Sequence, residues 1–435
     1  MIWRKLNLSR FFPFFIVFLF ITLFYANIAQ ALRSSPEDFL PLETKSFFYL
    51  ENKKDINLFP FLKGKVEIKE DKKFSFWENF HDLGWASLPE GEILFTKENL
   101  ERPPGFKPSL SENWFEKESK EEKAFALYVE SFWFFSEKES LLAKVELVKR
   151  KEDLPLKKDT NFRKVRENNF RVDNFFYQKS PDEFPLKKII PSFGFSFKAK
   201  RMTFFVPLPQ FSSPKNISEF VKFNFDSYKV FSVQTRNIEE VFDSLLSLVK
   251  KENKNMYLEF FKYKNLFLKE KVGDLESLSS KSADLFFLKR SFLMNLYGKI
   301  SQEECFDILS SSFFYEKEIS DNLLKIKKPK VELDKEKNEA RIRGKNLGEI
   351  SATFDKDVCH IKSKKYRKKE SDFEKEKSSA FLKIFASPEK IKKQFPYPSN
   401  EALLKNLLSF LPEKDFILRT FLTGKGISGH IYFLD

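Results

Sequence analysis

Alternating apolar and polar positions predict β-strands in three parts of the chain. The pattern covers Ser192–Leu208, Val331–Ile361 and the closing segment Phe416–Leu434, which is interrupted at Gly424-Lys425-Gly426. Side chains on a strand point alternately to its two faces, so this spacing is typical of sheets with one apolar face. We therefore expect antiparallel sheet in these segments.

A second pattern places a short apolar strand before an amphipathic helix. Lys229–Val233 precedes a helical pattern over residues 241–249, and Phe381–Phe385 precedes Ser387 and Pro388. Serine is a favoured N-cap and proline is favoured at the first helical position. The recurrence predicts repeated strand-helix modules.

Helical spacing of apolar residues predicts a helical hairpin. Asp274–Tyr297 carries leucine and phenylalanine three and four residues apart, a second run extends from Ser301 to Phe314, and Gly298 separates the two. Together with the modules, this predicts an α+β fold: repeated strand-helix modules with antiparallel sheets and a helical hairpin.

Pro-rich or charged joints near 102–108, 207–214 and 325–330 mark candidate domain boundaries. The predicted regions are a signal peptide (1–31), an N-terminal α+β region (32–210), a region containing the helical hairpin (211–326) and a C-terminal α+β region (327–435).

The first 31 residues have the order of a secretory signal. Arg4, Lys5 and Arg10 precede the uncharged apolar run Phe11–Tyr25, and Ala29-Gln30-Ala31 offers the small residues that a signal peptidase reads. This order predicts export to a periplasm-like compartment. The alternative is an uncleaved N-terminal helix that anchors the protein, because the apolar segment is long enough to cross a bilayer.

Composition excludes several classes of function. The 435 residues include 77 Lys plus Arg against 63 Asp plus Glu, a net charge of +14, with three His, two Cys and 12 Gly. Few His and Cys leave few ways to build a metal site, and no phosphate-binding glycine motif occurs, so we expect no cofactor. For an exported chain, positive charge favours an anionic membrane surface or envelope polymer over nucleic acid. The alternative is a solvated surface of interspersed Lys and Glu.

A short segment resembles a known family. Leu40-Pro41-Leu42-Glu43-Thr44 and the following apolar strand Ser46–Leu50 are similar to the start of the mature part in an uncharacterised family of exported bacterial proteins, and Ala380–Ala386 is a looser match. The resemblance implies an exported α+β protein of unknown function and transfers no functional residue.

No complete catalytic motif is present, and we predict no catalytic residue. Ser212 and Lys215 form a Ser-x-x-Lys motif, and Ser320-Asp321-Asn322 supplies a second element of a penicillin-binding or β-lactamase site. The third element, Lys-[Ser/Thr]-Gly, does not occur, so we interpret the match as chance. The 63 acidic residues show no spacing that singles out a catalytic pair.

The two cysteines allow two interpretations. Cys359 and His360 are adjacent and would point to opposite faces of a strand, so they would rarely share one metal ion. Cys305 and Cys359 either form a single disulfide in an oxidising compartment or remain two buried thiols. We favour the two buried thiols.

One dense basic cluster is the candidate site for binding an anionic surface. It has six cationic residues within eight positions: Lys362, Lys364, Lys365, Arg367, Lys368 and Lys369. The other interpretation, which we favour, is a solvated hairpin tip, because the acidic residues that follow weaken the field within a Debye length.

The sequence thus predicts an exported, non-catalytic protein that binds an envelope component or a protein partner. The alternative is an envelope hydrolase that acts through carboxylates the sequence does not locate.

Cleavage after Ala31 is directly testable. Mass spectrometry of the native protein should find Leu32 at the N-terminus, because the small residues at Ala29 and Ala31 fit the peptidase site. An intact Met1 in membrane extracts would instead favour the anchor.

Overall fold

The structure is a computed structural model. It describes residues 34–52, 80–98, 100–118, 123–169, 174–184, 186–198, 200–209, 218–221, 229–236, 238–255, 257–258, 282–288, 291–297, 300–310, 316–320, 323–327, 330–334, 336–344, 348–364, 375–394 and 414–434. The described residues fall into two compact units: unit 1 extends to Thr160, and unit 2 begins at Asn161.

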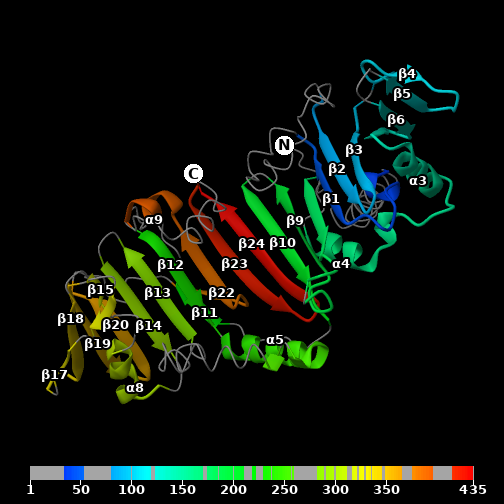
Figure 1. Ribbon diagram of the computed structural model, residues 1–435. Helices are drawn as coiled ribbons and strands as arrows, with labels where there is room; N and C mark the ends of the chain where they lie inside the picture. The colour runs from blue at the N-terminus through cyan, green and yellow to red at the C-terminus, as the bar shows by residue number, and fades with distance from the viewer. Residues whose placement is uncertain are drawn as a thin grey trace, which may run out of the picture. The chain divides into compact units, whose positions relative to one another are not determined.

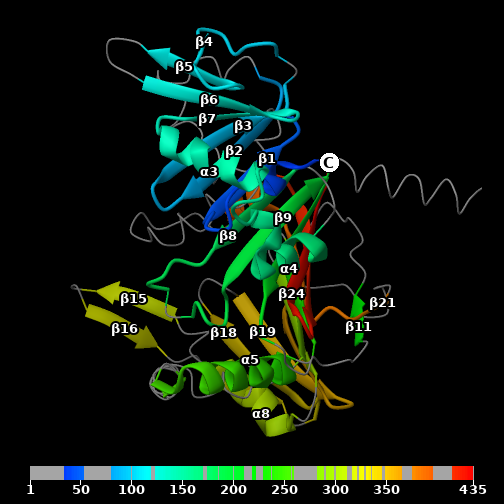
Figure 2. The same cartoon turned by 90° about the vertical axis from the view of Figure 1, so that its right-hand side faces the viewer.

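Unit 1 is an antiparallel sheet with one helix packed against it (Figure 2). Neighbouring strands follow the order β1 (Ser46–Leu50), β2 (Leu83–Leu88), β3 (Gly91–Thr96), β7 (Phe132–Ser136), β6 (Lys123–Val129), β5 (Trp114–Glu118) and β4 (Lys107–Pro108). Helix α3 (Glu139–Lys149) packs on β3, β6 and β7 through buried Leu141, Leu142 and Val145.

Aromatic residues form the core of unit 1. Phe47 stacks on Phe95 with ring centroids 5.7 Å apart, and Phe95 lies 5.8 Å from Phe134. The buried carboxylate of Asp82 accepts hydrogen bonds of 2.8 Å from the Tyr49 hydroxyl and the Lys97 backbone amide. A buried polar group requires such partners, so Asp82 fits as a structural residue.

Unit 2 is a longer antiparallel sheet (Figure 1). Its strands follow the order β8 (Phe175–Lys179), β9 (Ser192–Lys198), β10 (Arg201–Pro207), β24 (Gly426–Phe433), β23 (Phe416–Thr423), β22 (Leu382–Ala386), β12 (Lys229–Thr235), β13 (Ser282–Leu288), β14 (Ser291–Tyr297), β20 (Val358–Ser363), β19 (Gly348–Asp355), β18 (Glu339–Gly344) and β17 (Val331–Asp334). Two short pairs, β11 (Ser218–Val221) with β21 (Lys375–Ser378) and β15 (Glu316–Ser320) with β16 (Leu323–Lys327), complete the described strands.

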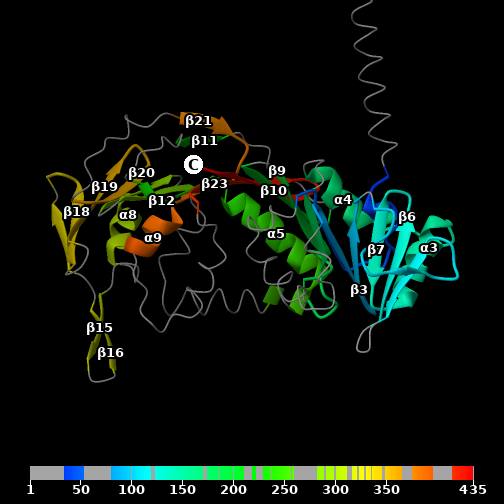
Figure 3. The same ribbon diagram turned by 90° about the horizontal axis from the view of Figure 1, so that it is seen from above.

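Different elements lie on the two faces of the unit 2 sheet. Helices α5 (Ile238–Glu252), α8 (Gln302–Asp307) and α9 (Pro388–Gln394) lie on one side, and the β11–β21 pair lies on the other (Figure 3). Helix α5 packs Val241 and Leu248 against Leu422. Helix α4 (Thr160–Asn168) approaches β9 so closely that a side chain at Gly194 would clash with Val165.

The predicted α+β fold is wrong, because the described chain is mostly antiparallel sheet with few helices. The predicted helical hairpin is also wrong: β13 and β14 form a β-hairpin within the segment Asp274–Tyr297. On β14, Phe292, Leu293 and Leu296 are buried, because the strand is covered on both faces. Their spacing therefore imitates one face of a helix.

The strands expected from alternating positions are confirmed. Ser192–Leu208 contains β9 and β10, Val331–Ile361 contains β17 to β20, and the closing segment forms the β23–β24 hairpin. The transitions from β12 to α5 and from β22 to α9 also occur where predicted, with Pro388 as the first residue of α9. However, β12 and β22 pair directly with each other, so these transitions belong to one sheet and not to repeated modules.

Cys305 and Cys359 form a disulfide, so the interpretation favouring two thiols is wrong. The bond links α8 to β20, with the two Cα atoms 5.5 Å apart, inside a core that includes Leu296, Ile308 and Ile361. Cysteine prefers a buried position both as a free thiol and in a disulfide, so burial alone does not distinguish the two states. The sequence does not show that Cys305 and Cys359 meet in the same core.

The signal-peptide prediction lies outside the described residues, which begin at Ser34. Within the described ranges, no helix combines the length and the apolar character needed to cross a membrane.

Removing the disulfide should destabilise unit 2 selectively. The bond closes a loop with a sequence separation of 54 residues, for which loop entropy gives about 4 kcal/mol of stabilisation. In the variant Cys305→Ala/Cys359→Ala, the unit 2 unfolding transition followed by circular dichroism should move to lower urea concentration.

Tryptophan fluorescence provides the control for this measurement. The described tryptophans, Trp85, Trp114 and Trp133, all lie in unit 1, so the transition followed by fluorescence should stay in place. Equal shifts of both transitions would contradict a stabilisation confined to unit 2.

Candidate ligand-binding surface

A continuous row of polar residues crosses the unit 2 sheet at right angles to its strands. Its members occupy directly paired positions on neighbouring strands, which places their side chains on one face. In strand order they are Ser196, Thr203, His430, Arg419, Lys383, Gln234, Asp284, Asn295, His360, Thr353, Glu339 and Asp334. We call this set the polar row.

The middle of the polar row is buried although it carries charge. Gln234 and Asp284 are fully buried, and Lys383 is 1% exposed. The flanking residues on β13 and β22 are mainly apolar, so each of these two strands reads as an apolar segment with one charged residue inside it. Burying such groups is costly unless they are hydrogen-bonded or paired.

Arg236 provides the partner for Asp284. Its guanidinium donates two hydrogen bonds to the carboxylate, of 2.7 and 3.1 Å, and the Tyr297 hydroxyl donates a third of 2.7 Å. The same guanidinium lies 4.9 Å from the ring centroid of Phe220 on β11 and 5.0 Å from that of Tyr297. These contacts fasten β11 to the polar-row face.

Glu376 on β21 pairs with the next two cations. Lys383 donates a hydrogen bond to one oxygen of its carboxylate, and Arg419 donates a 3.3 Å hydrogen bond to the other. Burial lowers the pKa of Lys383, and the hydrogen bond to Glu376 only partly offsets this effect. The β11–β21 pair thus covers the centre of the polar row with complementary charge.

At the edge of this cover, β10, β23 and β24 carry a cationic and aromatic patch, which shares Arg419 with the ion pair to Glu376. The guanidinium carbons of Arg201 and Arg419 lie 4.8 and 5.9 Å from the ring centroid of Tyr432, and Arg201 also donates a 3.0 Å hydrogen bond to its hydroxyl. The ring of His430 lies 5.3 Å from that of Phe421. We call Arg201, Arg419, Phe421, His430 and Tyr432 the cationic patch.

The patch is set up to receive negative charge. Burial lowers the pKa of His430, and the positive charges of Arg201 and Arg419 lower it further. Arg201 and Arg419 lie beside an imidazole and a phenol, and Arg419 is already paired with Glu376. Arg201 can therefore bind a phosphate or carboxylate while the rings contact its carbon skeleton.

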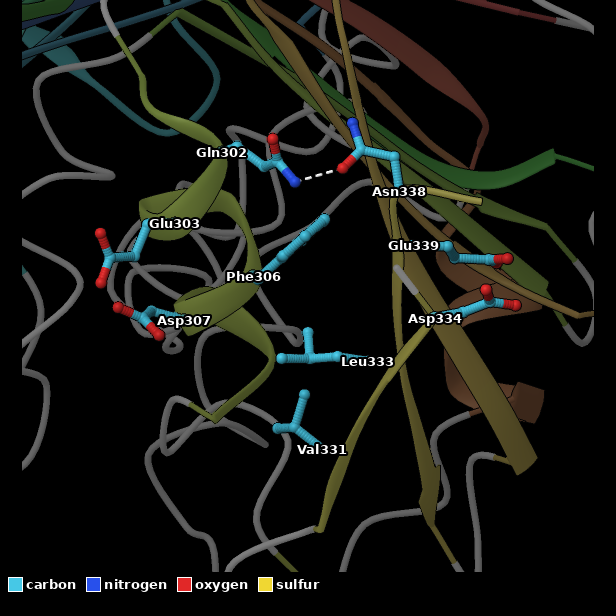
Figure 4. Close-up of a pocket in the computed structure, with 9 residues that line it drawn as sticks. All are labelled: Gln302, Glu303, Phe306, Asp307, Val331, Leu333, Asp334, Asn338 and Glu339. Carbon is cyan, nitrogen blue, oxygen red and sulfur yellow. Dashed lines mark hydrogen bonds between the residues drawn. The ribbon is translucent and has the colours of Figure 1, made fainter. Parts of the chain in front are cut away.

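The opposite end of the polar row carries carboxylates. Burial alone would raise the pKa of Glu339, but hydrogen bonds from Arg341 and Ser351 outweigh it and hold the pKa below its usual value. Arg341 also lies 3.9 Å from Asp334. Both residues lie at a groove beside α8, with their carboxylates pointing away from the helix (Figure 4).

Two members of the predicted basic cluster lie in the described chain. Lys362 on β20 and Lys364 after it are exposed, and Lys362 projects from the same sheet face as His360. Lys364 donates a 3.1 Å hydrogen bond to Glu349. Lys365, Arg367, Lys368 and Lys369 lie outside the described residues.

The Ser-x-x-Lys motif, Ser212 to Lys215, also lies outside the described residues. Ser320 ends β15, while Asp321 and Asn322 are not described. Cys359 is in the disulfide, and the adjacent His360 lies 2.9 Å from the Asn295 side-chain oxygen on the other face. Within the described residues, no three His, Cys, Asp or Glu side chains are grouped to hold a metal ion.

Neither the cationic patch nor the buried ion pairs were predicted from the sequence. A usable signal was the single charged residue inside an apolar strand, as at Asp284, Lys383 and Arg419. Such a residue indicates a buried polar contact, but its partners come from strands far apart in sequence.

Comparison with known proteins gave no match: no family model, no curated protein and no solved structure is significantly similar to this chain. The resemblance at residues 40–50 therefore stays an expectation from the sequence.

The pKa of His430 is a direct test of the patch geometry. NMR titration should place it below 6.5, and Arg201→Gln should raise it, because one positive charge is removed. Since the pKa is lowered in the folded state, protein stability should fall as the pH drops below about 6.5. An unchanged titration midpoint of His430 in Arg201→Gln would contradict the proximity of Arg201 to His430. The NMR signal of His430 is assigned by its loss in His430→Gln.

Proposed function

We propose that this protein is an exported, non-catalytic binding protein whose unit 2 holds a phosphate-bearing component of the cell envelope at the cationic patch. The observation that carries the proposal is the placement of Arg201 and Arg419 around Tyr432 and His430. Guanidinium groups bind phosphate with paired hydrogen bonds, which makes arginine the preferred residue for such ligands.

Two features support export. The N-terminal order of basic, apolar and small residues is that of a secretory signal. The buried disulfide is typical of proteins that fold in an oxidising compartment. The anchored alternative keeps the same compartment, because the rest of the chain would follow the N-terminal helix across the membrane.

Binding without catalysis agrees with the state of the reactive groups nearby. The Ser232 hydroxyl has no hydrogen-bond partner among the described residues, but it is fully buried, so a substrate does not reach it. Lys383 is held by Glu376. A hydrolase that uses Glu339 as its general acid would need a raised pKa, and the pKa of Glu339 is lowered.

The predicted basic cluster extends the proposed surface. Lys362 and the cationic patch both project from the polar-row face, on strands separated by the covered centre of the row. A phosphate-bearing chain that contacts one of them can reach the other on the same sheet face, on the far side of the β11–β21 pair. Each cation close to an anionic surface contributes about 1 kcal/mol.

The test is co-sedimentation of the full chain with vesicles of phosphatidylglycerol and phosphatidylcholine, compared with phosphatidylcholine alone. Binding to the anionic vesicles should weaken about fivefold in Arg201→Gln, the loss expected for one cation. The matched control is Arg163→Gln, which removes an arginine on α4 that is 61% exposed and lies outside the patch. Equal sedimentation of wild type and Arg201→Gln at low salt would contradict the proposal.

Two further arms identify the source of the phosphate and the role of the cluster. Soluble inorganic polyphosphate should release the protein from vesicles if the phosphate group itself is recognised. If the protein binds polyphosphate more tightly than it binds vesicles, its ligand is an envelope polymer and not a membrane surface. The variant with Lys364, Lys365, Arg367 and Lys368 changed to Ser measures the contribution of the basic cluster separately.

A further inference from the structure

A groove with an apolar floor runs along β17, between this strand and α8. Its volume is about 610 Å³. Phe306 of α8 and Val331 and Leu333 of β17 point into the space between the two elements (Figure 4). Leu333 is 60% exposed, which is unusual for a large apolar residue on a strand of a well-packed sheet.

β17 is also an edge of the unit 2 sheet. It pairs with β18 on one side. β14 pairs with β13 on one side and with β20 on the other, so it has no free side for β17. No strand in the described ranges pairs with the other side of β17. An open edge presents backbone donors and acceptors to which an extended segment can add as a further strand.

The charge around the groove selects the kind of segment. Four of the described lining residues are acidic and none is basic: Glu303 and Asp307 lie on α8, whereas the carboxylates of Asp334 and Glu339 lie on the polar-row face beside Arg341. Glu303 and Asp307 lie along α8 at the rim (Figure 4). Acidic groups around an apolar floor complement a segment that carries both basic and apolar residues.

We propose that β17 and this groove bind an extended segment of a partner protein with alternating apolar and basic residues, by strand addition. Alternate side chains of an added strand point to opposite faces. One set would contact Phe306 and Leu333 in the groove, and the other would lie beside Glu332 and Asp334 on the polar-row face. This site is independent of the cationic patch and takes a ligand of opposite charge.

The partner is a different protein and not a second copy of this chain. Two β17 strands placed side by side would bring Glu332 and Asp334 of one copy close to the same carboxylates of the other. Like charges on adjacent strands are destabilising.

The test uses a fluorescent eight-residue peptide of alternating Leu and Lys, with its affinity for the full chain measured by anisotropy. Leu333→Lys should weaken binding at least tenfold, because it places a positive charge in the groove. The change lies at an exposed position of an edge strand, so folding is preserved. The matched control is Leu154→Lys, at a leucine of unit 1 that is 55% exposed, which should bind as wild type does.

Two altered peptides separate the contributions. A peptide with Glu in place of Lys should bind wild type at least tenfold more weakly, and Glu303→Lys/Asp307→Lys should narrow or reverse that preference. A peptide methylated on alternate backbone nitrogens along the pairing edge should lose binding, because its donors to β17 are blocked.

Three results would overturn the proposal. Wild-type affinity in Leu333→Lys would exclude the groove, and full binding of the methylated peptide would exclude strand addition. Sedimentation velocity that shows self-association of the chain, lost in Leu333→Lys, would make a second copy the occupant.

Discussion

The ion pair between Arg236 and Asp284 is the interaction on which the arrangement of unit 2 depends. Asp284 is fully buried at the centre of the sheet. Arg236, directly after β12, and Tyr297, on β14, donate hydrogen bonds to its carboxylate. Removing one partner of such a buried pair costs about 3–5 kcal/mol, since the other charge is left uncompensated. The pair also holds Phe220, and therefore the cover of β11 and β21, on the polar-row face.

That cover divides one row of side chains into zones with different chemistry. Under β11 and β21 the charges are neutralised internally by Glu376 and Asp284. Outside the cover, the same sheet face is accessible at Arg201 and His430 in one direction and at Lys362 in the other. The positions where β11 and β21 end therefore determine which side chains of this face can contact a ligand.

The sequence was sufficient for local elements with a clear period. The strands β9, β10, β23 and β24 lie in segments where apolar and polar residues alternate, and they were predicted correctly. β13 and β14 were assigned to a helix, because burial on both faces removes alternation and Phe292, Leu293 and Leu296 then match a helical spacing. A short apolar run is compatible with the periodicity of a buried strand and with that of a helix.

The candidate sites were harder to predict, because they depend on pairing between distant segments. Gln234 is placed beside Asp284 and Lys383 only after β12 has paired with β13 and β22. The position of Tyr432 between Arg201 and Arg419 likewise requires the order β10, β24, β23. The basic cluster at 362–369 was visible because its residues are consecutive, whereas the cationic patch is assembled from three strands.

The disulfide has a consequence for the groove beside α8. This helix has six residues, and a helix of that length has little stability by itself in water. Phe306, which forms part of the groove wall, is adjacent to Cys305, and the covalent bond to β20 fixes this wall relative to the sheet. The groove is therefore pre-organised before any ligand arrives, so a binding segment loses its own conformational entropy without also having to order the helix that receives it.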